Sequence, residues 1–137
     1  MSDIAAVIDA SALLAYLQGE PGSERVTNAI AEGACISAAN VAEVLSKRAD
    51  AGDDPRALAR TLIGSGLLGN AAALEVVDVE LDDAVEIAAL RPHTRPRGLS
   101  LGDRACLALA ARRRCRAVTA DSGWIDLDLE IDVDVIR

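Results

Sequence analysis

Apolar residues follow two patterns along the chain, and the two patterns alternate. Short apolar runs, typical of buried strands, cover about residues 4–8, 34–36, 74–79 and 117–119. Between them, apolar residues at intervals of three and four predict helices over about 12–17, 23–32, 38–51, 55–63, 85–91 and 100–113. This alternation predicts an α/β fold with a central, mainly parallel sheet flanked by helices. Because the sequence shows no internal repeat and no linker, we expect residues 1–137 to form a single domain.

Polar residues and prolines predict where several elements begin and end. Ser11, Ser23 and Ser37 each precede an apolar helical pattern and are expected to act as N-caps. Asp54-Pro55 is an N-cap followed by a proline at the first helical position. Residues 91–98, rich in arginine and proline, are expected to form a loop.

The last strand region is predicted over residues 125–135, where apolar and acidic residues alternate without a break. A period of two places the five acids on one face, and these are Asp126, Asp128, Glu130, Asp132 and Asp134. Such a face is typical of a solvated edge strand guarded by charge. The alternative is a surface that binds a basic segment of a partner.

Composition narrows the class of protein. Hydrophobic residues make up 51% of the chain, but there is no Phe and only one Trp and one Tyr, so the core is aliphatic. We expect the Trp124 side chain to lie in this core rather than to contact a nucleic-acid base. No apolar run is long enough to span a membrane, and no signal-peptide pattern is present. Three unpaired cysteines are expected to be reduced thiols, mostly buried, in a cytoplasmic protein.

Charge is unevenly distributed. The net charge of −8 argues against a general electrostatic attraction to nucleic acid. Residues 91–116 nevertheless contain eight arginines and a single acid. The candidates for contacts with the phosphates of a nucleic acid are Arg95, Arg97, Arg112, Arg113 and Arg114. The alternative for the last three is a favourable cluster of positive charge at a helix C-terminus.

Four acids occupy equivalent places in the predicted fold. Asp9 and Asp121 follow strands, whereas Glu43 and Asp103 lie in the first turns of helices that begin near strand ends. A parallel sheet brings such positions to one edge, where α/β proteins bind their ligands. Each acid also has a purely structural interpretation: Asp9 as a turn or cap, Glu43 as a partner of Lys47, Asp103 as a capping residue and Asp121 as a turn residue.

Clustered carboxylates need a counter-charge. Two of them about 4 Å apart repel by about 4 kcal/mol at an effective dielectric constant of about 20. A hard divalent cation relieves this repulsion, and ligands that are all oxygen favour Mg²⁺ or Mn²⁺ over zinc. A metal held in this way activates water for attack on a phosphodiester.

The motifs that contain these acids resemble those of the PIN domain, and most of all the VapC-type toxins of bacterial toxin–antitoxin pairs. The resemblance runs from Val7 to about Val135 and rests on the motifs Asp9-Ala10-Ser11, Ser37-x-x-Asn40-x-x-Glu43, Leu99-Ser100-Leu101-Gly102-Asp103 and Thr119-x-Asp121-x-x-Trp124. It implies a PIN-like three-layer sandwich and a metal-dependent endoribonuclease. It also implies a homodimer that is inhibited by a cognate antitoxin protein.

The resemblance also assigns roles to residues. Asp9, Glu43, Asp103 and Asp121 would be the catalytic residues and would ligate Mg²⁺ or Mn²⁺. The supporting residues, which orient ligands or water, would be Ser11, Asn40 and Thr119. Many members have a further acid just after the position of Asp121, where this chain has Ser122-Gly123. This departure puts a second metal ion in doubt, but not the first.

Other functions remain open. A phosphoacceptor receiver domain also has acids at strand ends, but it needs a lysine at a late strand end, and the only lysine is Lys47. A haloacid-dehalogenase-like phosphatase needs an acid at the position of Ser11. A PIN nuclease that serves RNA processing outside a toxin pair fits the same residues, as does a catalytically silent PIN-like module that binds RNA or protein.

Overall fold

Six strands form one sheet in the computed structural model, which describes residues 4–137. Their order across the sheet is β3-β4-β2-β1-β5-β6, and every neighbouring pair is parallel. The strands are β1 (Ala6–Ile8), β2 (Ala34–Ser37), β3 (Leu68–Gly69), β4 (Leu74–Val77), β5 (Arg116–Thr119) and β6 (Val133–Val135). The predicted parallel sheet is confirmed, and the short edge strand β3 is an addition to it.

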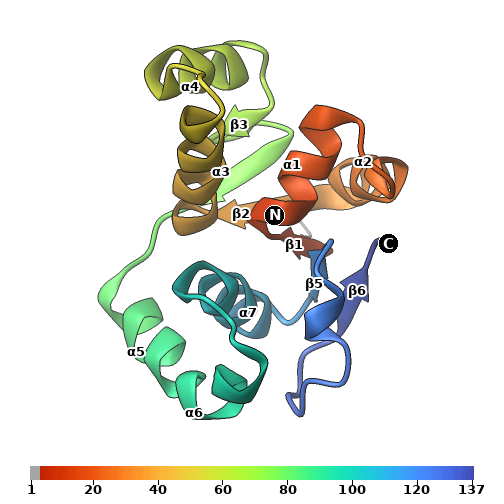
Figure 1. The fold of residues 1–137 in the computed structure, drawn as a ribbon, viewed down its shortest axis with the longest axis vertical. Coiled ribbons are helices and arrows are strands. Elements are labelled where there is room, and N and C mark those ends of the chain that lie inside the picture. The colour runs from red at the N-terminus through yellow and green to blue at the C-terminus, as the bar shows by residue number, and fades with distance from the viewer. Residues whose placement is uncertain (1–3) are drawn as a thin grey trace.

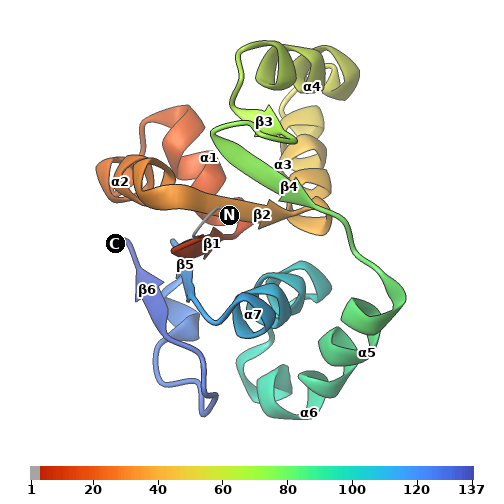
Figure 2. The ribbon, with the colours of Figure 1, turned by 180° about the vertical axis from the view of Figure 1, so that it is seen from behind.

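Helices cover both faces of this sheet (Figures 1 and 2). In Figure 1, α1 to α4 lie in the upper part of the molecule and α5 to α7 in the lower part. The helices are α1 (Ala10–Gln18), α2 (Ser23–Gly33), α3 (Ala38–Asp50), α4 (Pro55–Gly64), α5 (Leu81–Ala89), α6 (Arg91–Thr94) and α7 (Leu101–Arg113), with short 3₁₀ helices η1 (Arg95–Arg97) and η2 (Ser122–Trp124). The resulting three-layer sandwich is the predicted fold class.

Alternation along each strand sends side chains to two separate cores. Ala6 and Ile8 of β1 pack with the helices of the first layer. Val7, between them, packs on the other face with α7 and with Trp124, which is 1% exposed. The central strands are therefore apolar on both faces, and the predicted burial of Trp124 is confirmed.

Several predicted boundaries differ from the structure, and the helix predicted over 85–91, for example, is α5 at Leu81–Ala89. Asp9, and not Ser11, is the N-cap of α1. Ser23 is the first residue of α2, and Gly22 precedes it at the cap with a left-handed φ of 92°. The expected loop at 91–98 is mostly helical, because Pro92 lies in the first turn of α6, where a proline ring favours the start of a helix. The caps predicted at Ser37 and Asp54 are confirmed.

The strand predicted over residues 125–135 was too long. Only Val133–Val135 pairs with β5, which is itself four residues long and offers no partner for a longer strand. Upstream, η2 and the left-handed Asp126 (φ 64°) turn the chain away from the sheet. From residue 127 on, the sequence alternation survives as an alternation of burial, with half-buried apolar residues between mostly exposed acids, whereas Ile125 is exposed.

Two expectations from composition also have structural counterparts. Cys35 and Cys106 are free and buried, and Cys115 is free and half-buried, which agrees with the prediction of reduced thiols. Within residues 4–137, no helix is both long enough and apolar enough to cross a membrane.

Candidate active site

Asp9 lies at the carboxyl end of β1 and has three hydrogen-bond donors around its carboxylate. The backbone N–H of Ala12 donates to Oδ1 at 2.8 Å, and the Ser11 hydroxyl donates to the same oxygen at 2.8 Å. The Thr119 hydroxyl, from the end of β5, donates to Oδ2 at 2.6 Å. The side chain thus caps α1, and its position and orientation are fixed by donors from α1 and from the end of β5.

Burial dominates the acid–base behaviour of Asp9. The residue is 2% exposed, and this desolvation raises the pKa of Asp9 to about 6. The hydrogen bonds from Thr119, Ala12 and Ser11 lower the pKa and offset part of the rise, whereas the negative charge of Asp103 raises it further. The site therefore holds a carboxylate that would be stabilised by a nearby cation.

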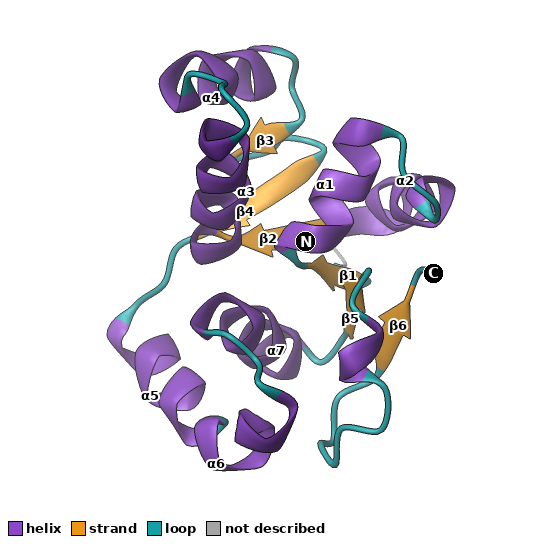
Figure 3. Cartoon of the chain, in the orientation of Figure 1, coloured by secondary structure: helices purple, strands orange, loops and turns teal. Residues whose placement is uncertain are grey.

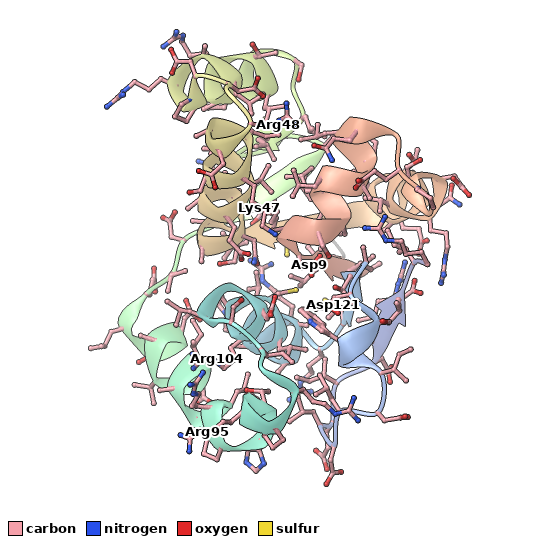
Figure 4. The ribbon with its side chains drawn as sticks, in the orientation of Figure 1. Asp9, Lys47, Arg48, Arg95, Arg104 and Asp121 are labelled. Carbon is pink, nitrogen blue, oxygen red and sulfur yellow. The ribbon has the colours of Figure 1, made fainter. Side chains whose placement is uncertain are left out.

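The end of β5 is joined to the same network. The Ser11 hydroxyl accepts from the Ala120 N–H at 2.9 Å, and the Thr119 hydroxyl accepts from the Asp121 N–H at 3.0 Å. Asp121 is exposed, and its Oδ1 accepts from the Gly123 N–H at 2.8 Å. Figure 4 shows Asp9 and Asp121 close together in the projection, between the two helical layers.

Glu43 reaches the site from α3. The Asn40 side chain, one helical turn earlier, donates from Nδ2 to Glu43 Oε1 at 3.3 Å and to the Gly102 carbonyl of α7 at 2.9 Å. Glu43 is half-buried, and its carboxylate lies against Gly102. Among the described residues, no ion pair forms between Glu43 and Lys47. The contact with α7 thus replaces the surface pair that was considered as an alternative.

Asp103 forms a capping box at the start of α7. Its Oδ2 accepts from the Ser100 N–H at 2.9 Å, and the Ser100 hydroxyl accepts from the Asp103 N–H at 3.1 Å. The structural interpretation of this acid is therefore correct. It is compatible with a second role, because Asp103 is close enough to Asp9 to raise the pKa of that carboxyl.

Residues 6–129 match the PIN domain family. The chain belongs to this family. In this PIN domain Asp9 follows β1 and Asp121 follows β5, at the carboxyl edge of the sheet, which is the edge where α/β proteins bind ligands.

Solved structures of toxin–antitoxin proteins have the same fold as this PIN domain. A DNA-bound VapBC from Salmonella typhimurium superposes with a TM-score of 0.70 at 16% identity, over 98% of this chain and 99% of the other. A toxin–antitoxin complex from Klebsiella pneumoniae gives a TM-score of 0.68 at 20% identity, over 97% and 98%. VapC20 of Mycobacterium tuberculosis, described as a sarcin-ricin loop cleaving toxin, gives 0.66 at 15%, over 86% and 91%. No curated protein matches the sequence of the chain.

The structure separates the candidate arginines of this PIN domain into two groups. Arg112 and Arg113 are paired with acids, Arg112 with Asp83 at 3.4 Å and Arg113 with Glu75 at 3.5 Å. They lie roughly 14 Å along α7 from Asp103, as a rise of about 1.5 Å per residue requires, and Arg114 ends the same helix. The structure thus favours the helix C-terminal interpretation for this run. Arg95 and Arg97 are exposed on η1, near the N-terminal end of α7.

The donor atoms of the site suit an oxygen-liganded cation, although the carboxylates are not gathered as closely as expected. Within residues 4–137, no three acidic, histidine or cysteine side chains form a group that could hold a metal ion. Asn40 is fully buried, and its Oδ1 has no hydrogen-bond partner among the described residues, so this oxygen is available to a further donor or a cation. Asp103 Oδ1 and Asp121 Oδ2 also make no hydrogen bond among the described residues.

Two features of the PIN domain were missed from the sequence. Gly102 approaches the Glu43 carboxylate closely, and a glycine inside a helical pattern was the available signal. Arg104 is buried rather than exposed, and its Nη1 donates to the Ile87 carbonyl of α5 at 3.0 Å. A cavity of about 720 Å³ lies elsewhere, between α5, the end of α7 and residues 128–132, and it contains none of the four acids.

Proposed function

We propose that this PIN domain is a metal-dependent endoribonuclease and the toxin of a toxin–antitoxin pair. Membership of a nuclease family and the likeness of its fold to VapC and FitB toxins support the proposal. The observation that carries it is Asp9: a buried carboxyl at the carboxyl edge of the sheet, with its pKa raised to about 6 and with Asp103 close enough to contribute to that rise. Burial of this kind is costly for a structural cap and useful for a site that binds a cation.

In this proposal, some residues of the chain bind the metal ion and others hold those ligands in place. Asp9, Glu43, Asp103 and Asp121 provide the carboxylate oxygens, which are the ligands preferred by Mg²⁺ and Mn²⁺. Ser11 and Thr119 hold the Asp9 carboxylate by hydrogen bonds, and Asn40 holds Glu43. Because the four acids do not yet form a closed group, their side chains would move toward one another on binding the ion.

A bound divalent cation would supply positive charge at the phosphodiester and lower the pKa of water. The protein's own residues would hold the carboxylates in place. Asp9 is fixed by donors from α1 and β5, so it needs little reorganisation, whereas Asp121 lies at the open side of the site, where RNA can approach.

We further propose that Arg95 and Arg97 contact RNA phosphates, since both are exposed and neither forms an ion pair among the described residues. Such contacts position RNA without reading its sequence. A cognate antitoxin and a homodimer are proposed from the family likeness. A single light-scattering measurement in solution decides the oligomeric state.

Cleavage of total cellular RNA by the purified protein tests the nuclease function. We expect discrete fragments with Mg²⁺ or Mn²⁺, none with EDTA, and none from the Asp9→Asn variant. Cleavage by Asp9→Asn at the wild-type rate would refute the site. A matched control is Asp54→Asn, because the exposed Asp54 caps α4 by the same kind of hydrogen bond, accepting from the Arg56 N–H, and belongs to none of these motifs.

Expression in growing cells separates the toxin from the remaining alternatives. A toxin arrests growth, and the Asp9→Asn variant does not. Cleavage without growth arrest would favour a PIN nuclease that processes RNA outside a toxin pair. Binding of RNA or protein without cleavage would favour a catalytically silent module.

A further inference from the structure

Gly102 lies in the first turn of α7, and the space that its side chain would fill is occupied by Glu43. A Cβ atom at this position would lie 1.8 Å from Glu43 Oε1 and 2.8 Å from Glu43 Cδ. Both distances are far below van der Waals contact. The Glu43 carboxylate therefore lies directly on the backbone of α7, one residue before Asp103.

The backbone conformation gives no other reason for a glycine here. Seven glycines of the described chain have a left-handed φ, and Gly102 is not among them. Inside a helix, alanine is favoured over glycine by up to about 1 kcal/mol. The glycine is therefore explained by the close approach of Glu43 and not by the conformation of the helix.

The Asn40 side chain contacts both Gly102 and Glu43. It is fully buried, and its Nδ2 donates both to the Gly102 carbonyl and to Glu43 Oε1. Since the Gly102 carbonyl can only accept, the amide nitrogen must face it, and Oδ1 is left facing away without a partner. The side chain thus connects α3 with the first turn of α7.

We propose that Gly102 is a positioning residue: because it has no Cβ and Asn40 anchors its carbonyl, the Glu43 carboxylate is held on the first turn of α7, beside Asp103. This inference rests on the proposed function for its catalytic meaning, because Glu43 and Asp103 are then ligands of the same ion. The geometry itself does not depend on the presence of a metal.

The Gly102→Ala variant tests this role, with Gly64→Ala as its control. Gly64 is also helical, also lacks a left-handed φ, and has no atom within 4 Å of its Cβ position. In Gly102→Ala the flexible end of Glu43 must move, and Asn40 Nδ2, 3.3 Å from the Cβ position, must shift slightly, so we expect the Tm in EDTA to stay close to that of the wild type. We expect its affinity for Mn²⁺ to fall at least roughly tenfold, and Gly64→Ala to keep the wild-type affinity.

A second measurement needs no metal. In NMR spectra recorded in EDTA, Gly102→Ala should shift the resonances of the Glu43 carboxyl and the Asn40 side-chain amide, and Gly64→Ala should leave both in place. Adding Gly102→Ala to a Glu43→Gln background should cause no further loss of Mn²⁺ affinity, because the affected ligand is already gone. A further loss there would show that the glycine acts elsewhere.

The two proposals fail in different ways. Wild-type protein that binds no Mn²⁺ and cleaves no RNA would refute the nuclease, and the NMR shifts would still decide the position of Glu43. A Gly102→Ala variant with unshifted resonances and wild-type Mn²⁺ affinity would overturn the role of Gly102 and leave the nuclease intact.

Discussion

At the scale of single residues, Asp9 combines a structural and a chemical role. It caps α1, as a structural interpretation of the sequence suggested, and it is also the most deeply buried of the four acids. The two roles have opposite effects on the free energy of the charged Asp9 carboxylate. The cap holds the carboxylate in place, while burial penalises its charge and raises the pKa of Asp9 to about 6.

The first prediction concerns stability without metal. Because the folded-state pKa of Asp9 lies above its unfolded value of about 3.8, its protonated form stabilises the fold at acid pH, and this contribution is lost as pH rises through about 6. Asp9→Asn has no charge to penalise and keeps an oxygen for the Ala12 N–H. We expect it to be more stable than the wild type near neutral pH in EDTA, by at most about 3 kcal/mol.

Thermal unfolding in EDTA across this pH range measures the effect. The gain in Tm should shrink as the pH falls from about 6 to about 4 and be absent at lower pH, where Asp9 is protonated in both states. Added Mn²⁺ should raise the Tm of the wild type and not that of Asp9→Asn. A constant difference at every pH would contradict the assigned pKa shift.

A second prediction concerns Thr119, whose hydroxyl lowers the pKa of Asp9 by donating to it at 2.6 Å. In Thr119→Val this donor is lost, so the pKa of Asp9 rises above about 6. The acid limb of the pH profile for RNA cleavage should therefore move to higher pH. Thr61→Val is the control, because the Thr61 hydroxyl donates only to a carbonyl within α4. An unmoved profile for Thr119→Val would rule out this coupling.

At the scale of elements, sequence patterns located helices and strands better than they located their ends. The caps at Ser37, Asp54 and Ser100 were predictable, because a polar residue directly precedes an apolar helical pattern. The helical conformation of residues 91–97 was not predictable, because proline is compatible with the first turn of a helix as well as with a loop. Figure 3 shows these residues as helix, with α6 at the end of α5 and a further short helix after it.

The third prediction separates the two groups of arginines by element. Arg112 and Arg113 at the end of α7 are already paired with acids, so replacing both with Gln should leave RNA affinity within about twofold of the wild type. Replacing Arg95 and Arg97 should weaken binding and reduce the slope of log K against log[salt] by about 1.4, since each contact with single-stranded RNA contributes about 0.7. A salt titration of RNA binding measures both variants. If replacing Arg112 and Arg113 weakened RNA binding more than replacing Arg95 and Arg97, the phosphate contacts would instead be made by the end of α7.

At the scale of the whole molecule, topology brings the site together. β1 and β5 are neighbours in the sheet although they are far apart in sequence, and the chain leaves them in opposite directions across it. Ligands of α/β proteins bind at such a reversal of strand order. Placing Asp9, Asp121 and the starts of α3 and α7 at this edge was therefore predictable from the strand pattern alone.

The distances within the site were not predictable in the same way. Periodicity says which edge a residue reaches, but not whether a carboxylate turns toward a neighbour or toward a backbone N–H. Asp103 and Asp121 each direct one oxygen to a local backbone donor, so the four acids are less tightly gathered than their sequence positions suggested. The dependence of Glu43 on Gly102 is likewise a contact between two segments, with no local sequence pattern of its own.

Calorimetric titration of the purified protein with Mn²⁺ tests most directly the claim that these acids form one cation site. We expect the wild type to bind the ion, and Asp9→Asn and Asp103→Asn each to lose at least roughly tenfold in affinity. Glu24→Gln, in the exposed first turn of α2, should bind like the wild type. Equal affinity in Asp9→Asn and the wild type would contradict the account.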